Sequence, residues 1–120
     1  MSHLVTIQTQ VRDPVAVAAA CARLKLPAPV HRTVKLFSAE ETGLTVELPG
    51  WRYPLVCQTA HGELKLDTFN GRWGNHSELD RFLQAYAVEM VKLQARRQGQ
   101  TAIEQPLADG SIRVQIAVKG

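Results

Sequence analysis

LVCQTAHGELKLDTF, residues 55–69, is the stretch that decides the predicted fold. Two strand-like runs, residues 55–60 and 63–69, flank His61 and Gly62. A pair of turn residues that ends in Gly is typical of a β-hairpin in which both turn residues take positive φ. The stretch therefore predicts two antiparallel strands that are joined by a tight turn.

Further strand-like runs lie on both sides of this hairpin. They cover residues 4–11, 30–37, 44–48 and 112–118, and a short extended run follows Gly99. The first and the last run alternate between apolar and polar residues, as strands do when they bury one face. The connection SAEETG supplies Gly43 for positive φ, and Asp109 and Gly110 make a turn before the last run.

A first helix is predicted at residues 14–24. Asp13 and Pro14 favour its start, because an Asp side chain accepts from the first free amides and Pro already has a helical φ. Its apolar stripe is narrow and rich in small side chains, which lets a helix lie close to a sheet. The stripe consists of Val17, Ala18, Cys21 and Leu24.

A second, longer helix is predicted at residues 77–99. Ser77 and Asp80 approximate a capping box at its start, and Gly99 marks its end. Its apolar residues recur at helical spacing. They are Leu79, Phe82, Leu83, Tyr86, Met90 and Leu93.

The predicted order is one strand, a helix, four strands, a helix and two strands. Because successive strands are joined directly, this order predicts an α+β fold with an antiparallel β-sheet of about five to seven strands and both α-helices packed on one face. A single domain is expected over residues 1–120, a length that forms a core without disulfides or metals.

The composition is that of an ordinary globular protein, with 45% hydrophobic and 21% charged residues. Cys21 and Cys57 are too few for a disulfide framework and are expected to be buried free thiols. The N-terminus has no signal-like pattern, and no run approaches the roughly 18 apolar residues of a membrane span. We therefore expect a cytoplasmic protein without membrane contact.

The segment FNGRWGNHS, residues 69–77, connects the hairpin to the second helix. Its Gly and Asn residues suit a turn, and Ser77 is expected to cap the helix. Free amides at a helix N-terminus also favour an anion. The segment is therefore a structural corner or a site for an anion or a partner, with these candidate residues: Arg72, Trp73, Asn75 and His76.

The sequence contains no motif for catalysis, metal binding or a cofactor. Its four His residues lack the spacing by which one helix presents two metal ligands: His3, His31, His61 and His76. It also lacks a nucleophile elbow and a Gly-rich phosphate loop. We therefore predict no catalytic residue, no metal ligand and no cofactor.

Lys92, Arg96 and Arg97 lie at the end of the second helix, where cations offset the negative pole of the helix dipole. In a chain with a net charge of +3 and a pI near 9.1, they are also candidates for contact with nucleic acid.

The sheet face away from the helices is expected to be open and polar. Its predicted residues are Thr6, Gln8, Gln10, Thr45, Glu47, Lys65, Asp67, Arg113 and Gln115. Such a face suits docking or self-association. The candidate contact residues on it are Gln8, Gln10, Arg113 and Gln115.

Several motifs follow one another along the chain: MSH at 1–3, IQTQVRD at 7–13, QAYA at 84–87, QG at 98–99 and DGSIRV at 109–114. Together they resemble domain-of-unknown-function family 1257, a conserved hypothetical reading frame of red-algal chloroplasts and cyanobacteria. The resemblance implies a small soluble α+β protein with no established activity. Some members are encoded near ferredoxin-like proteins or AAA-type ATPases, which implies an accessory role.

The sequence therefore favours a non-catalytic protein-binding or accessory module, with a protein partner or self-association. Two alternatives stay open. One is a nucleic-acid-binding protein that uses Lys92, Arg96 and Arg97. The other is a small-molecule or anion-binding enzyme at the corner from Arg72 to His76.

Overall fold

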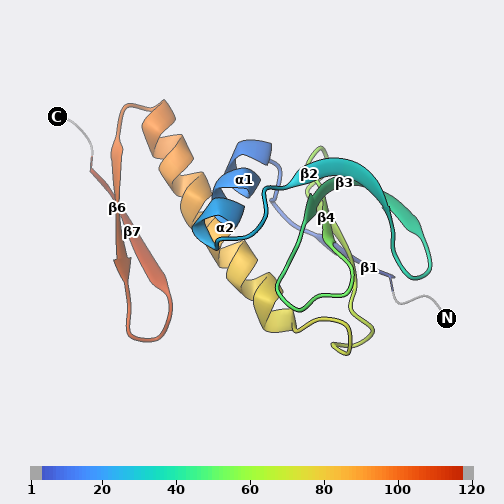
Figure 1. The fold of residues 1–120 in the computed structure, drawn as a ribbon. Helices are drawn as coiled ribbons and strands as arrows, with labels where there is room; N and C mark the ends of the chain where they lie inside the picture. The colour runs from blue at the N-terminus through green and yellow to red at the C-terminus, as the bar shows by residue number, and fades with distance from the viewer. Residues whose placement is uncertain (1–3, 118–120) are drawn as a thin grey trace.

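A computed structural model describes residues 4–117, in which helices and strands follow one another in the predicted order (Figure 1). The strands are β1 (Leu4–Gln8), β2 (Val30–Lys35), β3 (Glu40–Val46), β4 (Leu55–Gln58), β5 (Glu63–Asp67), β6 (Thr101–Pro106) and β7 (Ile112–Ala117). The helices are α1 (Pro14–Arg23) and α2 (His76–Arg97). None of the helices in this part of the chain has both the length and the apolar character that a bilayer crossing requires.

Five strands form one antiparallel sheet in the order β1-β5-β4-β3-β2. β6 and β7 pair only with each other, as a separate hairpin. The α+β fold with an antiparallel sheet is thereby confirmed. Val118, which the sequence pattern adds to the last strand, lies outside the described residues.

Both helices pack on one face of the sheet, as predicted. Phe82 of α2 is fully buried, and Ala16 and Ala20 let α1 lie close to the strands. Ala18, which was expected in the α1 stripe, is exposed, so that assignment is wrong. The core joins the two helices to β3, β4 and β5 through Val17, Cys21, Val46, Leu55, Cys57, Leu64, Leu66, Leu79 and Tyr86.

Tyr86 holds the connection between β1 and α1. Its hydroxyl accepts hydrogen bonds from the main-chain amides of Arg12 and Asp13, each at 3.1 Å, and donates to the Gln10 carbonyl at 3.3 Å. Asp13 caps α1 as predicted, since its carboxylate accepts from the amides of Val15 and Ala16. One buried hydroxyl therefore fixes where the chain leaves the sheet and enters the helix.

The turn between β4 and β5 differs from the prediction. Gln58 pairs with Glu63, so residues 59–62 make a four-residue turn, and only Gly62 has positive φ (72°). Gly43 is also misplaced by the prediction, because it lies inside β3 without positive φ. A Cβ on Gly43 would lie 2.9 Å from the carbonyl oxygen of Cys57, so close approach to β4 is what requires glycine there.

The second helix begins earlier than predicted. The Asn75 side chain accepts from the Ser77 amide at 2.9 Å, so Asn75 is the N-cap and the predicted capping box at Ser77 is wrong. Trp51 fixes this start from a distant loop. Its indole N–H donates to the Asn75 carbonyl at 3.0 Å, and a Cβ on Gly74 would lie 2.7 Å from its ring.

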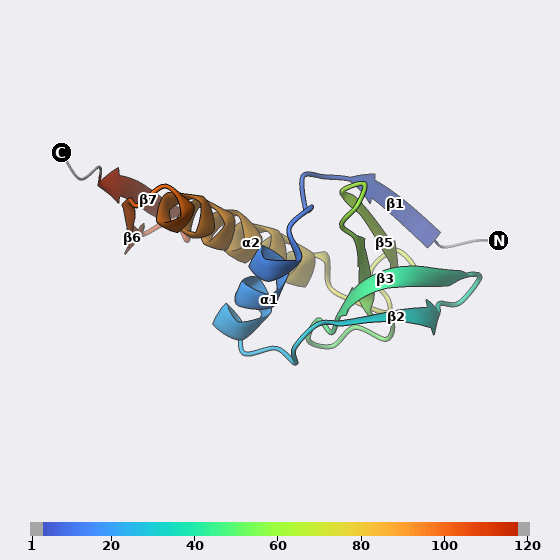
Figure 2. The ribbon, with the colours of Figure 1, turned by 90° about the horizontal axis from the view of Figure 1, so that it is seen from above.

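The sheet face away from the helices is not open at its centre, which corrects the predicted free face. Thr45 and Asp67 are 2% and 1% exposed, and Val56 on the same face is fully buried. β2 and β3 curve strongly (Figure 1), and Figure 2 shows the same two strands from above, at the side of the sheet opposite β1. Leu36, in the turn between them, is buried, and Phe37 beside it contacts Trp73 in the loop after β5. The curved β2–β3 hairpin therefore covers part of this face.

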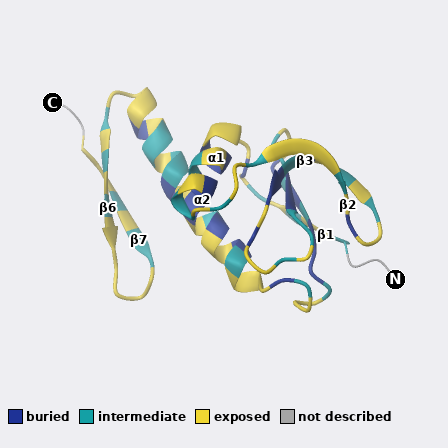
Figure 3. Cartoon of the chain, in the orientation of Figure 1, coloured by how far each residue is buried: buried dark blue, intermediate teal, exposed yellow. Residues whose placement is uncertain are grey.

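The β6–β7 hairpin extends from the far end of α2, so the molecule measures 57 × 31 × 23 Å. Figure 3 shows that most of this hairpin is exposed. An isolated two-stranded hairpin is only marginally stable, so its attachment matters. Glu104 of β6 contributes ion pairs with Arg23 of α1 and Lys92 of α2, and the Gln84 side chain of α2 donates to the Gly110 carbonyl in the β6–β7 turn at 2.9 Å.

Candidate functional site

Two loops meet at one end of the five-stranded sheet. One loop precedes β4, and the other connects β5 to α2. The Arg52 amide donates to the Trp73 carbonyl at 2.7 Å, which joins the loops directly. Asn70 and Gly71 take positive φ (53° and 90°), so the second loop turns sharply and presents Trp73 toward the first.

Trp73 lies at the centre of an aromatic group. Its ring centroid is 4.7 Å from that of Phe69, 5.1 Å from that of Phe37 and 5.7 Å from that of Tyr53. These are four of the seven aromatic residues of the chain, brought together from three separate segments. Separations and tilts of this kind are the favourable ones for aromatic pairs.

Two arginines lie over these rings. The guanidinium carbon of Arg52 is 5.0 Å from the Trp73 ring centroid, and that of Arg72 is 5.0 Å from the Phe69 centroid. Both distances are within the range of cation–π contacts. We refer to the six residues as the aromatic–arginine cluster: Phe37, Arg52, Tyr53, Phe69, Arg72 and Trp73.

The cluster is accessible and already assembled. Phe37 is 53% exposed, and both arginines are exposed. Among the ion pairs formed within residues 4–117, none involves Arg52 or Arg72. A guanidinium that stacks through its face keeps its N–H groups at its edges, where they suit carboxylates and phosphates. The cluster therefore combines apolar area with accessible charged donors.

The four residues predicted at the corner do not form one site in the structure. Arg72 and Trp73 join the cluster, whereas the Asn75 side chain is engaged as the helix cap. His76 is exposed and lines a separate cavity of about 350 Å³ with Thr68 and other residues, but not with Arg72 or Trp73. The predicted grouping at the helix N-terminus is therefore not the one that forms.

Sequence reasoning missed three members of the cluster: Phe37, Arg52 and Tyr53. The run WRYP at residues 51–54 has aromatic and basic residues side by side, and this signal could have indicated two of them. Phe37 gives no such signal, because it lies in the turn between two curved strands and meets Trp73 only in the folded chain.

The basic residues at the end of α2 are largely engaged with carboxylates. Lys92 is 2.8 Å from Glu104 and 3.6 Å from Glu89, and Arg97 is 3.3 Å from Asp13. Arg96 is exposed and lines a cavity of about 410 Å³ beside β6. Lys92 therefore joins α2 to β6, and Arg97 joins α2 to the start of α1. These ion pairs reduce the positive charge that is free to contact nucleic acid.

Glu104 is the centre of that ion-pair network. Hydrogen bonds from Arg23 and then Lys92 lower the pKa of the Glu104 carboxyl from 4.5 to about 2. The same contacts raise the pKa of Arg23 and of Lys92. Because the pKa of the carboxyl is depressed by folding, its stabilising effect is complete above pH 4.5 and disappears as the pH falls toward about 2.

We expect Glu104→Gln to lower the free energy of unfolding by about 1 kcal/mol at pH 7, because the network loses its only acid on β6. The difference from wild type should shrink below pH 4.5 and vanish near pH 2. Urea unfolding across this pH range measures it. Glu47→Gln is the control, since Glu47 pairs with Arg32 at a more exposed site and should matter by less than about 0.5 kcal/mol. A pH-independent loss for Glu104→Gln would contradict the ion-pair explanation.

The candidate sheet-face residues lie on two separate surfaces. Gln8 is at the edge strand β1 and donates to the His61 carbonyl at 2.7 Å, and Gln10 lies just beyond β1. Arg113 and Gln115 are exposed on β7, which does not belong to the main sheet. The prediction that these four residues share one face is therefore wrong.

The thiols are buried as predicted. Burial raises the pKa of Cys21 to about 11 and that of Cys57 to about 12, so both stay protonated near neutral pH. Within residues 4–117, no group of three His, Cys, Asp or Glu side chains is arranged to hold a metal ion. His3 lies outside the described residues.

No family model matches the chain, and neither the curated proteins nor the solved structures contain a significant match. The resemblance to domain-of-unknown-function family 1257 therefore stays a prediction from the sequence motifs.

Proposed function

We propose that the chain is a non-catalytic module that binds a protein partner through the aromatic–arginine cluster. The observation that carries this proposal is the gathering at one end of the sheet of four aromatic rings and two arginines that form no ion pair within residues 4–117. The six residues include no His, Asp or Glu, the residue types that general acid–base catalysis uses most often. The cluster thus suits binding better than acid–base chemistry.

The residue types of the cluster favour protein recognition, and so does the conformational order of its rings. Trp, Tyr and Arg are the residues that most often dominate the binding energy of protein interfaces. Because Trp73 is held between Phe37 and Phe69, these rings would lose little conformational freedom on binding. A suitable partner would place an apolar side chain beside Phe37 and carboxylates at the edges of Arg52 and Arg72.

An accessory role is consistent with the family resemblance of the sequence. A module of this kind would act by positioning its partner, with the five-stranded sheet as a rigid support for the cluster. Self-association through the same surface is included in this proposal, since a second copy is also a protein partner.

We expect the double variant Arg52→Glu/Arg72→Glu to bind its partner at least about tenfold more weakly than wild type, because both guanidinium contacts are replaced by repulsion. Immobilised wild-type and variant chains are exposed to lysate of the source cell, and retained proteins are quantified by mass spectrometry. Sedimentation of the purified chain detects self-association.

The matched control is Arg12→Glu combined with Lys25→Glu, which makes the same change in charge at exposed positions outside the cluster. A protein retained equally by wild type and control but lost from the cluster variant supports the proposal. If wild type and the cluster variant retain the same proteins and sediment alike, the cluster is not the binding surface.

Single-stranded nucleic acid is a second candidate partner for the same cluster. Aromatic rings with adjacent arginines form stacking platforms for unpaired bases in proteins that bind single strands. Fluorescence polarisation with labelled oligo(dT) and oligo(U) tests this candidate. Binding that weakens steeply with salt and is lost in the double arginine variant would favour it over a protein partner.

A further inference from the structure

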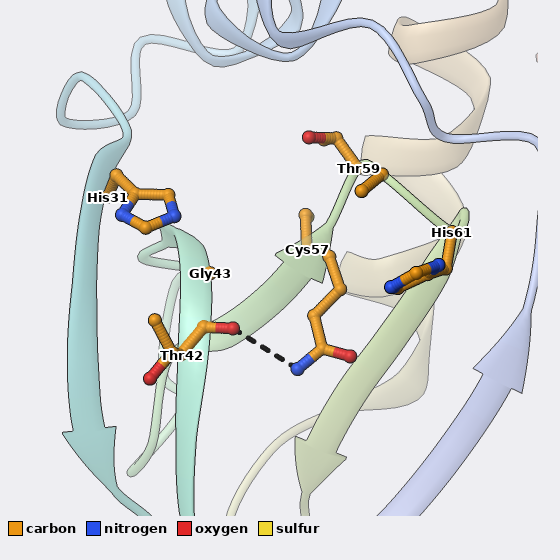
Figure 4. Close-up of a pocket in the computed structure, with 8 residues that line it drawn as sticks. His31, Thr42, Gly43, Cys57, Thr59 and His61 are labelled. Atoms are coloured by element: carbon orange, nitrogen blue, oxygen red, sulfur yellow. Dashed lines mark hydrogen bonds between the residues drawn. The ribbon is translucent and has the colours of Figure 1, made fainter.

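A cavity of about 300 Å³ opens where β3 and β4 part (Figure 4). The two strands pair at three positions, of which Leu44 with Cys57 is the last. In this register Gly43 would pair with Gln58 and Thr42 with Thr59, but neither pair forms because the strands have separated there. The cavity therefore lies where the pairing between β3 and β4 would otherwise continue.

The Gln58 side chain bridges part of this opening. Its amide nitrogen donates to the Thr42 carbonyl at 3.1 Å, as the dashed line in Figure 4 shows, and to the Glu41 carboxylate at 3.2 Å. The N–H and C=O groups of one strand residue point to the same side. The Thr42 N–H is therefore directed toward β4 as well, where the ladder supplies no partner.

Two imidazoles flank the opening from different elements. His31 comes from β2 and His61 from the turn after β4, and Figure 4 shows them on opposite sides of the cavity. Thr59 lies at its rim between them. An imidazole and a hydroxyl each present a hydrogen-bond donor to a ligand.

The remaining lining residues carry no charged side chain. The eight lining residues include no Asp, Glu, Lys or Arg. Cys57 is 1% exposed and protonated, so it offers no thiolate. Gly43 passes so close to β4 that any side chain there would meet the Cys57 carbonyl.

We propose that this cavity is a binding site for a small molecule that carries a carboxylate or phosphate group. The Thr42 N–H, the Thr59 hydroxyl and the two imidazoles would donate to its oxygens. A donor-rich lining favours an acceptor-rich ligand, and the cavity volume lies near the lower end of the range for small-molecule sites. The site shares no residue with the aromatic–arginine cluster and is independent of its function.

The test is a nuclear magnetic resonance titration of the isotope-labelled full chain. The probes are inorganic phosphate and, separately, acetate, with sodium chloride at equal ionic strength as the reference. Saturable shifts of the Thr42 amide and of the His31 and His61 ring protons are expected. The titration that saturates, with phosphate or with acetate, shows which of the two anionic groups the cavity prefers.

The variant His31→Ala/His61→Ala is expected to bind at least about tenfold more weakly, because it loses two donors. Both positions are exposed, so the fold should survive, and resonances away from the cavity verify it. Thr59→Val provides a second variant with the same expected direction, and Gln105→Ala, at an exposed position of β6, is the control that should bind normally. Shifts that rise linearly in both arms, or that persist unchanged in the double variant, would overturn the proposal.

Discussion

Replacing Gly62 with Ala is expected to lower the free energy of unfolding by more than about 3 kcal/mol. Ala at a φ of 72° costs about 1 kcal/mol by itself. The larger effect is steric, because the new Cβ would lie 2.3 Å from the main-chain oxygen of Thr9. Thr9 cannot simply move away, since its amide and its hydroxyl both donate to the Gly62 carbonyl at 2.7 Å.

Gly50→Ala is the matched control for this prediction. Gly50 has nearly the same φ, 75°, but a Cβ there would have no atom within 4 Å. Its replacement should therefore cost only the backbone strain, about 1 kcal/mol. Urea unfolding followed by circular dichroism measures both variants. Equal losses for the two would show that the turn and Thr9 are not in close contact in solution.

Gly62 also shows how far the sequence could predict the fold. The HG pair correctly indicated a hairpin, because a strand-like run lies on each side of it. The sequence indicated only one of the two reasons for glycine at position 62, which is positive φ. Positive φ is a local property, whereas contact with Thr9 joins residues that lie 53 positions apart. Local patterns therefore give the strands, but not the packing between segments.

The start of α2 illustrates the same limit. Asn75 and Ser77 are both good N-cap residues, so propensity alone does not choose between them. Contacts of Trp51 favour the start at Asn75, since its indole N–H donates to the Asn75 carbonyl and its ring contacts Gly74. Because Trp51 belongs to another loop, no pattern within the helix predicts its effect.

The candidate site was predictable only in part, for a related reason. Arg72 and Trp73 lie in one conspicuous segment, and the sequence indicated both. Their neighbours Phe37 and Arg52 come from other turns, and strand curvature and a main-chain bond bring them together. A surface built from three loops has no single sequence signal.

For Asp67, strand alternation predicts the correct face of the sheet, but the predicted exposure to solvent is wrong. Alternation places its side chain on the face away from the helices, as it does for Lys65. That face was expected to meet solvent, but Asp67 is 1% exposed. Neither of its carboxylate oxygens has a hydrogen-bond partner among the described residues.

We expect Asp67→Asn to raise the free energy of unfolding by about 2 kcal/mol at neutral pH. Removing a carboxylate from water without giving it a partner destabilises the folded state, and a charged group costs more than a neutral amide of the same shape. Asn has nearly the volume of Asp, so packing against Val56 and its neighbours should be kept. Urea unfolding at constant ionic strength measures the difference.

The control is Asp80→Asn, which makes the same change in net charge at an exposed position of α2 and should shift stability by less than about 0.5 kcal/mol. A gain confined to Asp67→Asn would locate the destabilisation at this buried carboxylate. A loss of stability would mean that the carboxylate is paired in solution, because only a group that gains a partner on folding makes its removal unfavourable. The sign of the change thus decides between an unpaired buried acid and a paired one.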